Sequence, residues 1–334
     1  MRLHLNENTA GCSPAVLGTL RALGRNDAGF YPDYDKARSA AAACFGVPDS
    51  HVVLTNGLDE GILAAAAAAL RERTGGLPEA VGVEPAFDMY EKCTTALGGR
   101  MVTVPLPSGF MLDPAVLQAA VTDATRIVFV ANPHNPSGVA SDLELLRELA
   151  RVIAPVLLFV DEAYADFSGE TLIEPETFSR IPNLVVGRTF SKAYGIAGLR
   201  VGAVVGLPAT LEPIARVIPP YSLNAWAAAA LPVAVADREY RAWYLEQSAA
   251  SRALLHDACQ RLGLETWPSL ANFLLIRVGD RARDIVSAMA GRGVLVRDRS
   301  RERGCEQCIR ITAGLVADTR RAIEALEEVL CAVR

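Results

Sequence analysis

The sequence predicts an α/β protein with a large three-layer α/β/α domain and a smaller α+β domain. Between residues 52 and 206, short apolar runs alternate with helical stretches, which is typical of parallel strands joined by crossover helices. This pattern ends at Pro219-Pro220, after which a long helical region leads to a few further strands. A chain of 334 residues is also longer than one hydrophobic core usually supports. We therefore expect a mostly parallel sheet of seven strands, followed by a second, smaller lobe.

Seven apolar runs are the expected strands of the large sheet: 52–55, 80–84, 101–104, 126–131, 156–160, 184–188 and 201–205. The expected helices between them include 59–73, 113–121 and 141–153. The second of these begins at Asp113-Pro114, a favourable helix start. In the third, Ser141 and Glu144 have the spacing of a capping box.

The C-terminal part predicts a helical region at 225–262, strands at 273–278, 294–297 and 309–312, and helices at 281–291 and 317–333. We expect residues 30–222 to form the large domain and residues 223–334 the small domain. Residues 1–29 are expected to associate with the small domain.

Composition and charge exclude several classes of function. The net charge is −5 and the pI is near 5.5, with no basic stripe for nucleic acid and no polybasic membrane anchor. Residues 1–8 lack the apolar stretch of a secretory signal, and the longest apolar runs are too short to span a bilayer. The odd number of cysteines, seven, argues against a disulfide framework, and Cys305 and Cys308 form an isolated pair rather than a metal site. We expect a cytoplasmic protein that binds no metal.

Lysine is scarce in this chain, and one lysine lies in a segment suited to chemistry. Of the 33 Lys+Arg residues, 30 are arginines and only three are lysines, namely Lys36, Lys92 and Lys192. Arginine stays protonated, whereas a lysine amine can lose its proton and form an imine with a carbonyl. Around Lys192, the residues Thr189, Ser191 and Arg200 suit a dianionic phosphate. A carbonyl and a phosphate together indicate pyridoxal 5′-phosphate (PLP) as the cofactor.

Two polar segments follow expected strands, where the catalytic groups of α/β proteins collect. Acidic residues often end a buried strand, but Asp161 is also suited to hold a pyridine nitrogen protonated, with Tyr164 bonding the phenolic oxygen of the same ring. The Asn/Pro/Gly cluster at 132–138 is typical of a turn, yet Asn135 could donate to that phenolic oxygen. In this cluster we interpret His134 as a turn residue rather than a catalytic base.

A third segment, Gly57, Leu58 and Asp59, lies between an expected strand and an expected helix. Exposed N–H groups at a helix N-terminus bind phosphate, so this turn is a candidate for the phosphate end of the cofactor. The signatures of nucleotide-binding loops, zinc proteases and serine hydrolases are absent from the sequence.

Taken in order, these residues resemble fold-type I PLP-dependent aminotransferases of class I/II, most closely the histidinol-phosphate aminotransferase branch. The matching segments are 5–8, 30–33, 57–60, 85–90, 132–138, 161–164, 191–192, 198–200, 271–273 and 308–312. The resemblance runs over nearly the whole chain and implies the seven-stranded fold described above.

The resemblance also implies roles for individual residues. Lys192 would move a proton between the substrate Cα and the cofactor, with Asp161 and Tyr164 as the other catalytic residues. Phe87 would stack on the pyridine ring, and Tyr31 of the partner subunit would reach the cofactor phosphate, so that a homodimer shares its active sites. The substrate-binding residues implied are Arg310, for a carboxylate, together with Asn135, Asn8 and Asn272.

The expected function is amino transfer between glutamate/2-oxoglutarate and a second pair, with histidinol phosphate and imidazole acetol phosphate as the leading candidates. The sequence departs from that branch on the substrate side, where Ala10 replaces a Tyr and Ser222 replaces an Asn. Three alternatives stay open. They are an aminotransferase for another aromatic or specialised amino compound, a PLP-dependent decarboxylase of the threonine-phosphate type, and a non-catalytic binding protein on this fold.

Overall fold

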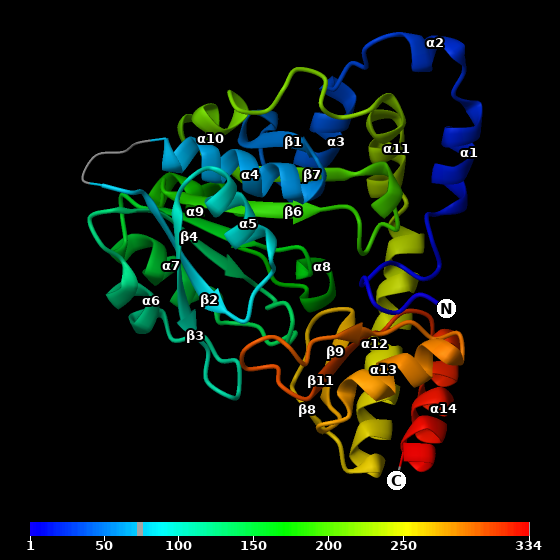
Figure 1. Ribbon diagram of the computed structural model, residues 1–334. Helices are drawn as coiled ribbons and strands as arrows, with labels where there is room; N and C mark the ends of the chain where they lie inside the picture. The colour runs from blue at the N-terminus through cyan, green and yellow to red at the C-terminus, as the bar shows by residue number, and fades with distance from the viewer. Residues whose placement is uncertain (72–75, 334) are drawn as a thin grey trace.

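The computed structural model describes residues 1–71 and 76–333 and contains two sheets (Figure 1). The larger one has seven strands in the order β1-β7-β6-β5-β4-β2-β3. Its strands are β1 (Val52–Asn56), β2 (Glu79–Glu84), β3 (Arg100–Pro105), β4 (Thr125–Ala131), β5 (Leu157–Asp161), β6 (Leu184–Thr189) and β7 (Val201–Gly206). Only β7 runs antiparallel to its neighbours, β1 and β6. The expected seven-stranded, mostly parallel sheet is confirmed.

Helices cover both faces of this sheet because successive strand residues point to opposite sides. On one face, Phe129 and Phe159 pack in a core with α4 (Gly57–Leu70) and α10 (Pro208–Ala215). On the other face, Val128 and Val160 pack in a second core. Residues of α3 (Asp35–Phe45), α6 (Pro114–Ala120), α7 (Leu143–Val152), α9 (Pro175–Arg180) and α11 (Ala225–Ala236) belong to this second core. The remaining helices of this part are α2 (Arg25–Gly29), α5 (Met89–Ala96) and α8 (Ala165–Ser168).

The smaller sheet is antiparallel, with the order β10-β11-β9-β8. Its strands are β8 (Glu265–Thr266), β9 (Phe273–Arg277), β10 (Arg297–Asp298) and β11 (Cys308–Thr312). It packs against α13 (Ala282–Gly291), α14 (Val316–Val333) and the second half of α12 (Arg238–Leu262). The chain start joins this core, since Leu3 is fully buried and its N–H donates to the Leu295 carbonyl at 2.8 Å.

Two expected elements of the C-terminal part differ in the structure. The single helical region 225–262 is two helices, because Asp237 ends α11 and caps α12 by accepting a hydrogen bond from the Tyr240 N–H at 3.2 Å. The strand expected at 294–297 is reduced to Arg297–Asp298. Before it, Leu295 pairs instead with Arg2 of the chain start.

Two expected helices of the large domain also need correction. Helix α7 begins at Leu143 and is capped by Asp142, which accepts from the Glu144 N–H at 2.7 Å. The capping role expected for Ser141 is therefore wrong, because its N–H donates to Asn132 Oδ1 at 2.8 Å. For the helix expected at 59–73, α4 ends at Leu70, and positions 72 and 73 lie outside the described residues.

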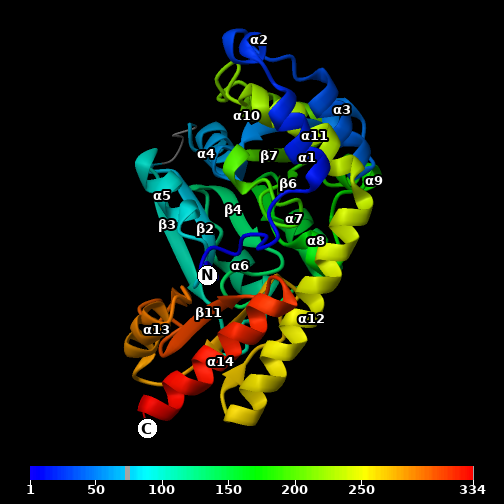
Figure 2. The same ribbon diagram turned by 90° about the vertical axis from the view of Figure 1, so that its right-hand side faces the viewer.

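The domain limits stay a prediction, and the packing favours different ones. Helix α11 contacts α3 and α1 (Pro14–Ala22), and both Val16 of α1 and Leu231 of α11 belong to a core of the large sheet. A boundary near Asp237, after α11, therefore suits the contacts better than one at residue 222. Figure 2 shows α12 continuing from that point along the molecule into the small domain. No helix within residues 1–71 and 76–333 is long and apolar enough to cross a membrane.

Candidate active site

A cavity of about 420 Å³ lies where the chain start, the large domain and the small domain meet. It adjoins the carboxyl ends of β4, β5 and β6, where α/β proteins place their ligands. Most residues expected from the sequence line it: Leu58, Asp59, Phe87, Asn135, Asp161, Tyr164, Thr189, Ser191, Lys192, Arg200 and Arg310. The structure thus brings these eleven residues of the sequence-predicted site into one cavity.

Asp161, the last residue of β5, is a buried carboxylate held from two sides. Its Oδ2 accepts from the Tyr90 hydroxyl at 2.7 Å, and its Oδ1 accepts from the Ala163 N–H at 3.0 Å. Burial raises the pKa of Asp161 to about 6. A cationic N–H group beside it would lower that pKa again and keep the carboxylate ionised.

Lys192 lies in the same cavity, and its Nζ donates to the Leu5 carbonyl at 2.9 Å. Desolvation, helped by the charge of Arg310, lowers the pKa of Lys192 to about 8. A substantial fraction of the amine is therefore neutral near physiological pH. A neutral amine can act as a nucleophile and can accept a proton.

One end of the cavity is suited to an anion. The N-terminus of α4 points here, and the hydroxyl-bearing Thr189 and Ser191 are buried beside it, with Thr189 Oγ1 accepting from the Ser191 N–H at 3.2 Å. Arg200 forms an ion pair with Asp59 at 2.7 Å. Gly57 has φ +73°, and a Cβ there would lie 2.5 Å from Arg200 Nη2, so only glycine lets this arginine approach the helix N-terminus. Backbone N–H groups, hydroxyls and a guanidinium together form a phosphate-type cradle.

Tyr164 has a partner that the sequence reasoning missed. Asn6 Nδ2 donates to the Tyr164 hydroxyl at 2.9 Å, and the Asn6 N–H donates to Thr312 Oγ1 at 3.1 Å. Asn6 is buried and adopts φ +55°, which orients its side chain into the site. Its position in the segment 5–8, two residues before Asn8, is the signal that could have identified it.

Arg310, on β11, reaches into the cavity from the small domain. It is buried, donates to Asn135 Oδ1 and donates to the His4 carbonyl at 3.2 Å. Burial lowers the pKa of Arg310 to about 10. Its Nε has no hydrogen-bond partner among residues 1–71 and 76–333, so the site can still accept an anionic ligand.

Four expected site residues are not among those that line this cavity; one of them, Gly57, directly precedes the lining residue Leu58. Asn8 borders an adjoining cavity and donates to the Ala193 carbonyl at 3.2 Å. Asn272 is buried behind Asn6, to whose carbonyl it donates at 3.1 Å. Tyr31 is 78% exposed and stacks on Tyr221 with ring centroids 4.2 Å apart, away from the cavity of its own chain.

His134, interpreted from the sequence as a turn residue, is buried in the structure. Its ring nitrogens contact the Ser137 hydroxyl at 2.8 Å and the Pro85 carbonyl at 2.9 Å. Burial lowers the pKa of His134 to about 4. Its contacts therefore hold the turn rather than face the cavity.

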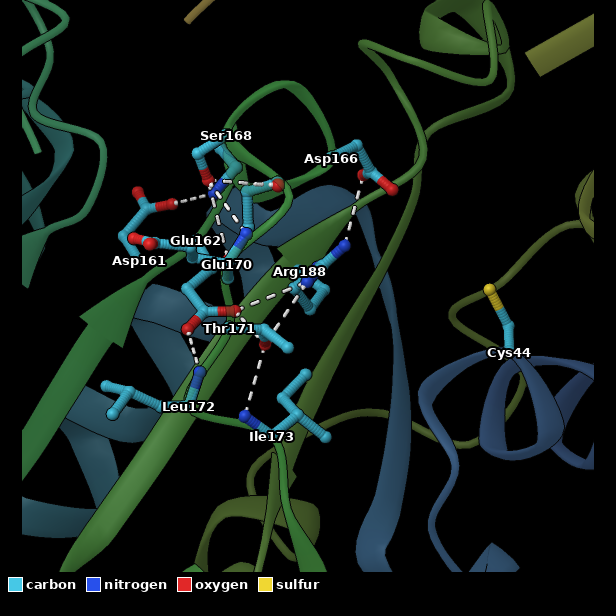
Figure 3. Close-up of polar contacts among 12 residues, drawn as sticks. Cys44, Asp161, Glu162, Asp166, Ser168, Glu170, Thr171, Leu172, Ile173 and Arg188 are labelled. Carbon is cyan, nitrogen blue, oxygen red and sulfur yellow. Dashed lines mark hydrogen bonds and ion pairs between the residues drawn. The ribbon is translucent and has the colours of Figure 1, made fainter. Parts of the chain in front are cut away.

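Behind the cavity, a buried ion network fixes the ends of β5 and β6. Glu162 directly follows Asp161 in sequence, and Arg188 directly precedes Thr189. The side chains of Glu162 and Arg188 point toward one another and lie 3.2 Å apart (Figure 3). Arg188 also pairs with Asp166 at 3.1 Å. Glu162 further accepts from the Leu172 N–H at 2.6 Å. The two strands that carry Asp161 and Thr189 are thus joined by side chains as well as by the sheet.

Comparison with known proteins identifies the family of the chain. Residues 1–326 match the model of the family described as aminotransferase class I and II. The chain is 37% identical over 344 residues to histidinol-phosphate aminotransferase 2 of Ralstonia nicotianae, covering 99% of this chain and 88% of that protein. It is 36% identical to the histidinol-phosphate aminotransferase of Akkermansia muciniphila, covering 99% and 90%.

Solved structures show the same fold. Histidinol-phosphate aminotransferase from Sinorhizobium meliloti, in complex with pyridoxal-5′-phosphate, superposes with a TM-score of 0.90 at 28% identity, covering 100% of this chain and 91% of that chain. L-threonine-O-3-phosphate decarboxylase from Porphyromonas gingivalis superposes with a TM-score of 0.84 at 25% identity, covering 99% of each chain. As the sequence resemblance predicted, the chain belongs to the class I and II aminotransferases, enzymes that use pyridoxal 5′-phosphate as their cofactor.

Proposed function

We propose that the protein transfers an amino group between glutamate/2-oxoglutarate and the pair histidinol phosphate/imidazole acetol phosphate. The observation that supports this most strongly is the cavity that Lys192 shares with the buried carboxylate of Asp161 and the guanidinium of Arg310. The relatives that cover almost the whole chain at 36–37% identity are histidinol-phosphate aminotransferases, which supports the choice of the second substrate pair.

The residues of the cavity fit PLP at both ends. Asp161 would hold the pyridine nitrogen, because this buried carboxylate has only the Tyr90 and Ala163 donors and no cation in contact within the described residues. The phosphate would bind at the α4 N-terminus, whose close contact with Arg200 leaves no room for a Cβ at Gly57. We assign the remaining cofactor contacts to the following residues: Leu58, Asp59, Thr189, Ser191 and Arg200 for the phosphate, Phe87 for the ring face, and Asn135 and Tyr164 for the phenolic oxygen.

The chain's own groups then perform distinct tasks. When bound, PLP supplies an electron sink that stabilises negative charge developing at the substrate Cα. Lys192 Nζ, whose pKa is lowered to about 8, removes the proton from that Cα and returns it later in the reaction. Arg310 binds the substrate's anionic group and thereby fixes the orientation of the substrate. This orientation determines which bond at Cα is broken. The Leu5 carbonyl, 2.9 Å from Nζ, orients the amine.

A comparison of half-reactions tests this function. Holoenzyme incubated with L-glutamate alone should release 2-oxoglutarate stoichiometrically, and histidinol phosphate with 2-oxoglutarate should then give glutamate catalytically. Among a panel of amino donors, we expect the highest kcat/KM for histidinol phosphate. Release of carbon dioxide from L-threonine O-3-phosphate without oxo-acid formation would instead establish the decarboxylase alternative.

We also propose that two copies of the chain form a homodimer in which Tyr31 of the partner subunit completes the phosphate site. Phe30 and Tyr31 are 73% and 78% exposed, and the adjacent Tyr221 is 52% exposed. Three exposed aromatic rings at one place are typical of a covered surface. Tyr31 is also outside the cavity of its own chain, so it is available to a second one.

Mixing two variants, one that binds PLP weakly and one that lacks the catalytic lysine, tests the shared site. Tyr31→Ala should weaken PLP binding by about 10- to 100-fold, as expected for loss of a hydrogen bond to a charged group. Mixed with Lys192→Arg after mild dissociation, it should recover activity at limiting PLP, since one site of each hybrid dimer has both native residues. No recovery, with hybrids verified by mass, would place Tyr31 in a purely structural role.

A further inference from the structure

Asn6, the partner of Tyr164 in the chain start, has no assigned role in the reaction. It is only 1% exposed and lines the cavity. Its Nδ2 donates to the Tyr164 hydroxyl oxygen at 2.9 Å. Because an amide NH2 group can only donate, the Tyr164 oxygen is the acceptor in this contact. The hydroxyl proton of Tyr164 is therefore left for a different partner.

Contacts with the small domain hold the Asn6 amide in this orientation. The Asn6 N–H donates to Thr312 Oγ1 at 3.1 Å, so the Thr312 hydroxyl is free to donate to Asn6 Oδ1, 3.3 Å away. With Oδ1 as that acceptor, Nδ2 is the atom that faces Tyr164. The Asn6 carbonyl in turn accepts from Asn272 Nδ2 at 3.1 Å. A side chain fixed by several hydrogen bonds can orient its neighbour with little loss of conformational freedom.

The Tyr164 hydroxyl keeps its proton and directs it at the cavity. Burial raises the pKa of Tyr164, so the group stays protonated near neutral pH. Within residues 1–71 and 76–333, the hydroxyl is bonded to the Asn6 donor and has no protein acceptor for its own proton. A buried O–H group without an acceptor is unfavourable. Since Tyr164 lines the cavity, a ligand in the cavity would supply the acceptor.

The phenolic oxygen of PLP is an acceptor of the required kind. When ionised, this oxygen favours the protonated form of a nitrogen beside it, such as that of Lys192 once it is joined to the cofactor. A hydroxyl that donates to the oxygen disperses its charge and weakens this effect. An N–H group that donates to the same hydroxyl polarises it and makes it a stronger donor. Asn6 and Tyr164 thus act in series on one oxygen.

We propose that Asn6 is a positioning residue, which directs the Tyr164 hydroxyl proton at the phenolic oxygen of the cofactor and so lowers the proton affinity of the Lys192 nitrogen joined to it. A substrate amine has to lose its proton before it can attack a carbon atom. A neutral Lys192 nitrogen can take up that proton. The inference rests on the proposed contact between Tyr164 and the cofactor, and it is independent of which amino compound is the substrate.

The charges around Lys192 and Tyr164 stay the same when Asn6 is replaced by a neutral residue. The charged groups that face either side chain are Glu7, Asp59, Asp161, Arg200, Arg299 and Arg310. In the described part of the chain, the side chain of Asn6 hydrogen-bonds to none of these and has Tyr164 and Thr312 as its partners. A change in proton affinity on removal of the Asn6 side chain therefore points to the Tyr164 contact.

The substitution N6G tests this role through the visible absorbance of the holoenzyme, titrated with pH in the absence of substrate. Asn6 has φ +55°, which glycine adopts without strain. In N6G we expect the midpoint of the absorbance transition to rise by about 0.5 to 1 pH unit, which corresponds to the loss of one hydrogen bond. In N6D a carboxylate of the same shape would accept the Tyr164 proton, so the midpoint should rise further. An unchanged midpoint in both variants would overturn the proposal.

The Y164F background separates an effect through Tyr164 from a general change of structure. Y164F alone should raise the midpoint at least as much as N6G does. Adding N6G to Y164F should then shift it by less than about 0.3 pH units, because the hydroxyl that transmits the effect is gone. Equal shifts by N6G in both backgrounds would contradict the proposal. An unchanged midpoint in Y164F would refute the cofactor contact on which it rests. If these shifts occur but histidinol phosphate is not turned over, only the substrate assignment fails.

Discussion

A Lys192→Arg variant is expected to fold normally and to lose turnover by a factor of about 10⁴, the upper range for removal of a general acid–base group. Arginine keeps the positive charge and most of the volume but stays protonated, so it can neither bind the cofactor covalently nor accept the Cα proton. Steady-state turnover and the visible absorbance of the purified protein measure the two losses separately. Thermal unfolding of the variant checks that its fold is intact.

The other two lysines provide matched controls. Lys36 and Lys92 lie outside the cavity, and Lys92 pairs with Asp88 at 3.3 Å on the surface. Lys36→Arg and Lys92→Arg should therefore retain wild-type activity. Borohydride reduction of the wild type should attach the cofactor to the peptide that contains Lys192. Cofactor recovered on a peptide with Lys36 or Lys92 would show that the assignment is wrong.

Asp161→Asn is expected to reduce kcat by a factor on the order of 10² to 10³, since it leaves a cationic ring nitrogen without its buried counter-ion. The asparagine keeps the shape of the side chain: its Oδ1 can accept from the Ala163 N–H, and its Nδ2, in the place of Oδ2, can donate to the Tyr90 hydroxyl oxygen. The change therefore removes charge more than shape. Stopped-flow measurement of the glutamate half-reaction isolates the affected step. PLP affinity should fall as well, because the cofactor loses an ion pair.

Tyr90→Phe separates the carboxylate's charge from its positioning. It removes only the hydroxyl that donates to Asp161 Oδ2, at 2.7 Å, and keeps the ring stacked on Phe129 with centroids 4.9 Å apart. We expect a smaller loss of kcat than in Asp161→Asn, with PLP still bound. An Asp161→Asn variant as active as the wild type would remove the carboxylate from the catalytic residues.

Residues at the ends of strands were the predictable part of the site. Asp161 and Thr189 each end a strand of alternating or continuous apolar character, and the carboxyl ends of parallel strands meet at one edge of a sheet. Lys192 and Arg200 lie in the connection that follows Thr189. The fold class alone is therefore enough to predict that they lie near Asp161. Arg310 required the resemblance, because periodicity does not show how two domains face each other.

Contacts between distant segments were the unpredictable part. Tyr90 lies on a helix and Asn6 in the chain start, and their bonds to Asp161 and Tyr164 depend on tertiary packing that local patterns do not encode. Arg299, which also lines the cavity, follows the expected strand 294–297 in a loop whose packing the sequence does not show. The helix break at Asp237 had a readable signal, since Asp is a favourable N-cap residue.

The contacts of the chain start determine when the site can form during synthesis. Leu5 contacts Lys192 across 187 positions of sequence, and Asn6 contacts Thr312 across 306. This segment leaves the ribosome before the strands of both sheets and can dock fully only after β11, the last strand, has been made, whereas the seven-stranded sheet is complete by Gly206. Contacts of such high order form slowly and late. A nascent chain halted before β11 has its cofactor lysine but lacks the residues that enclose it.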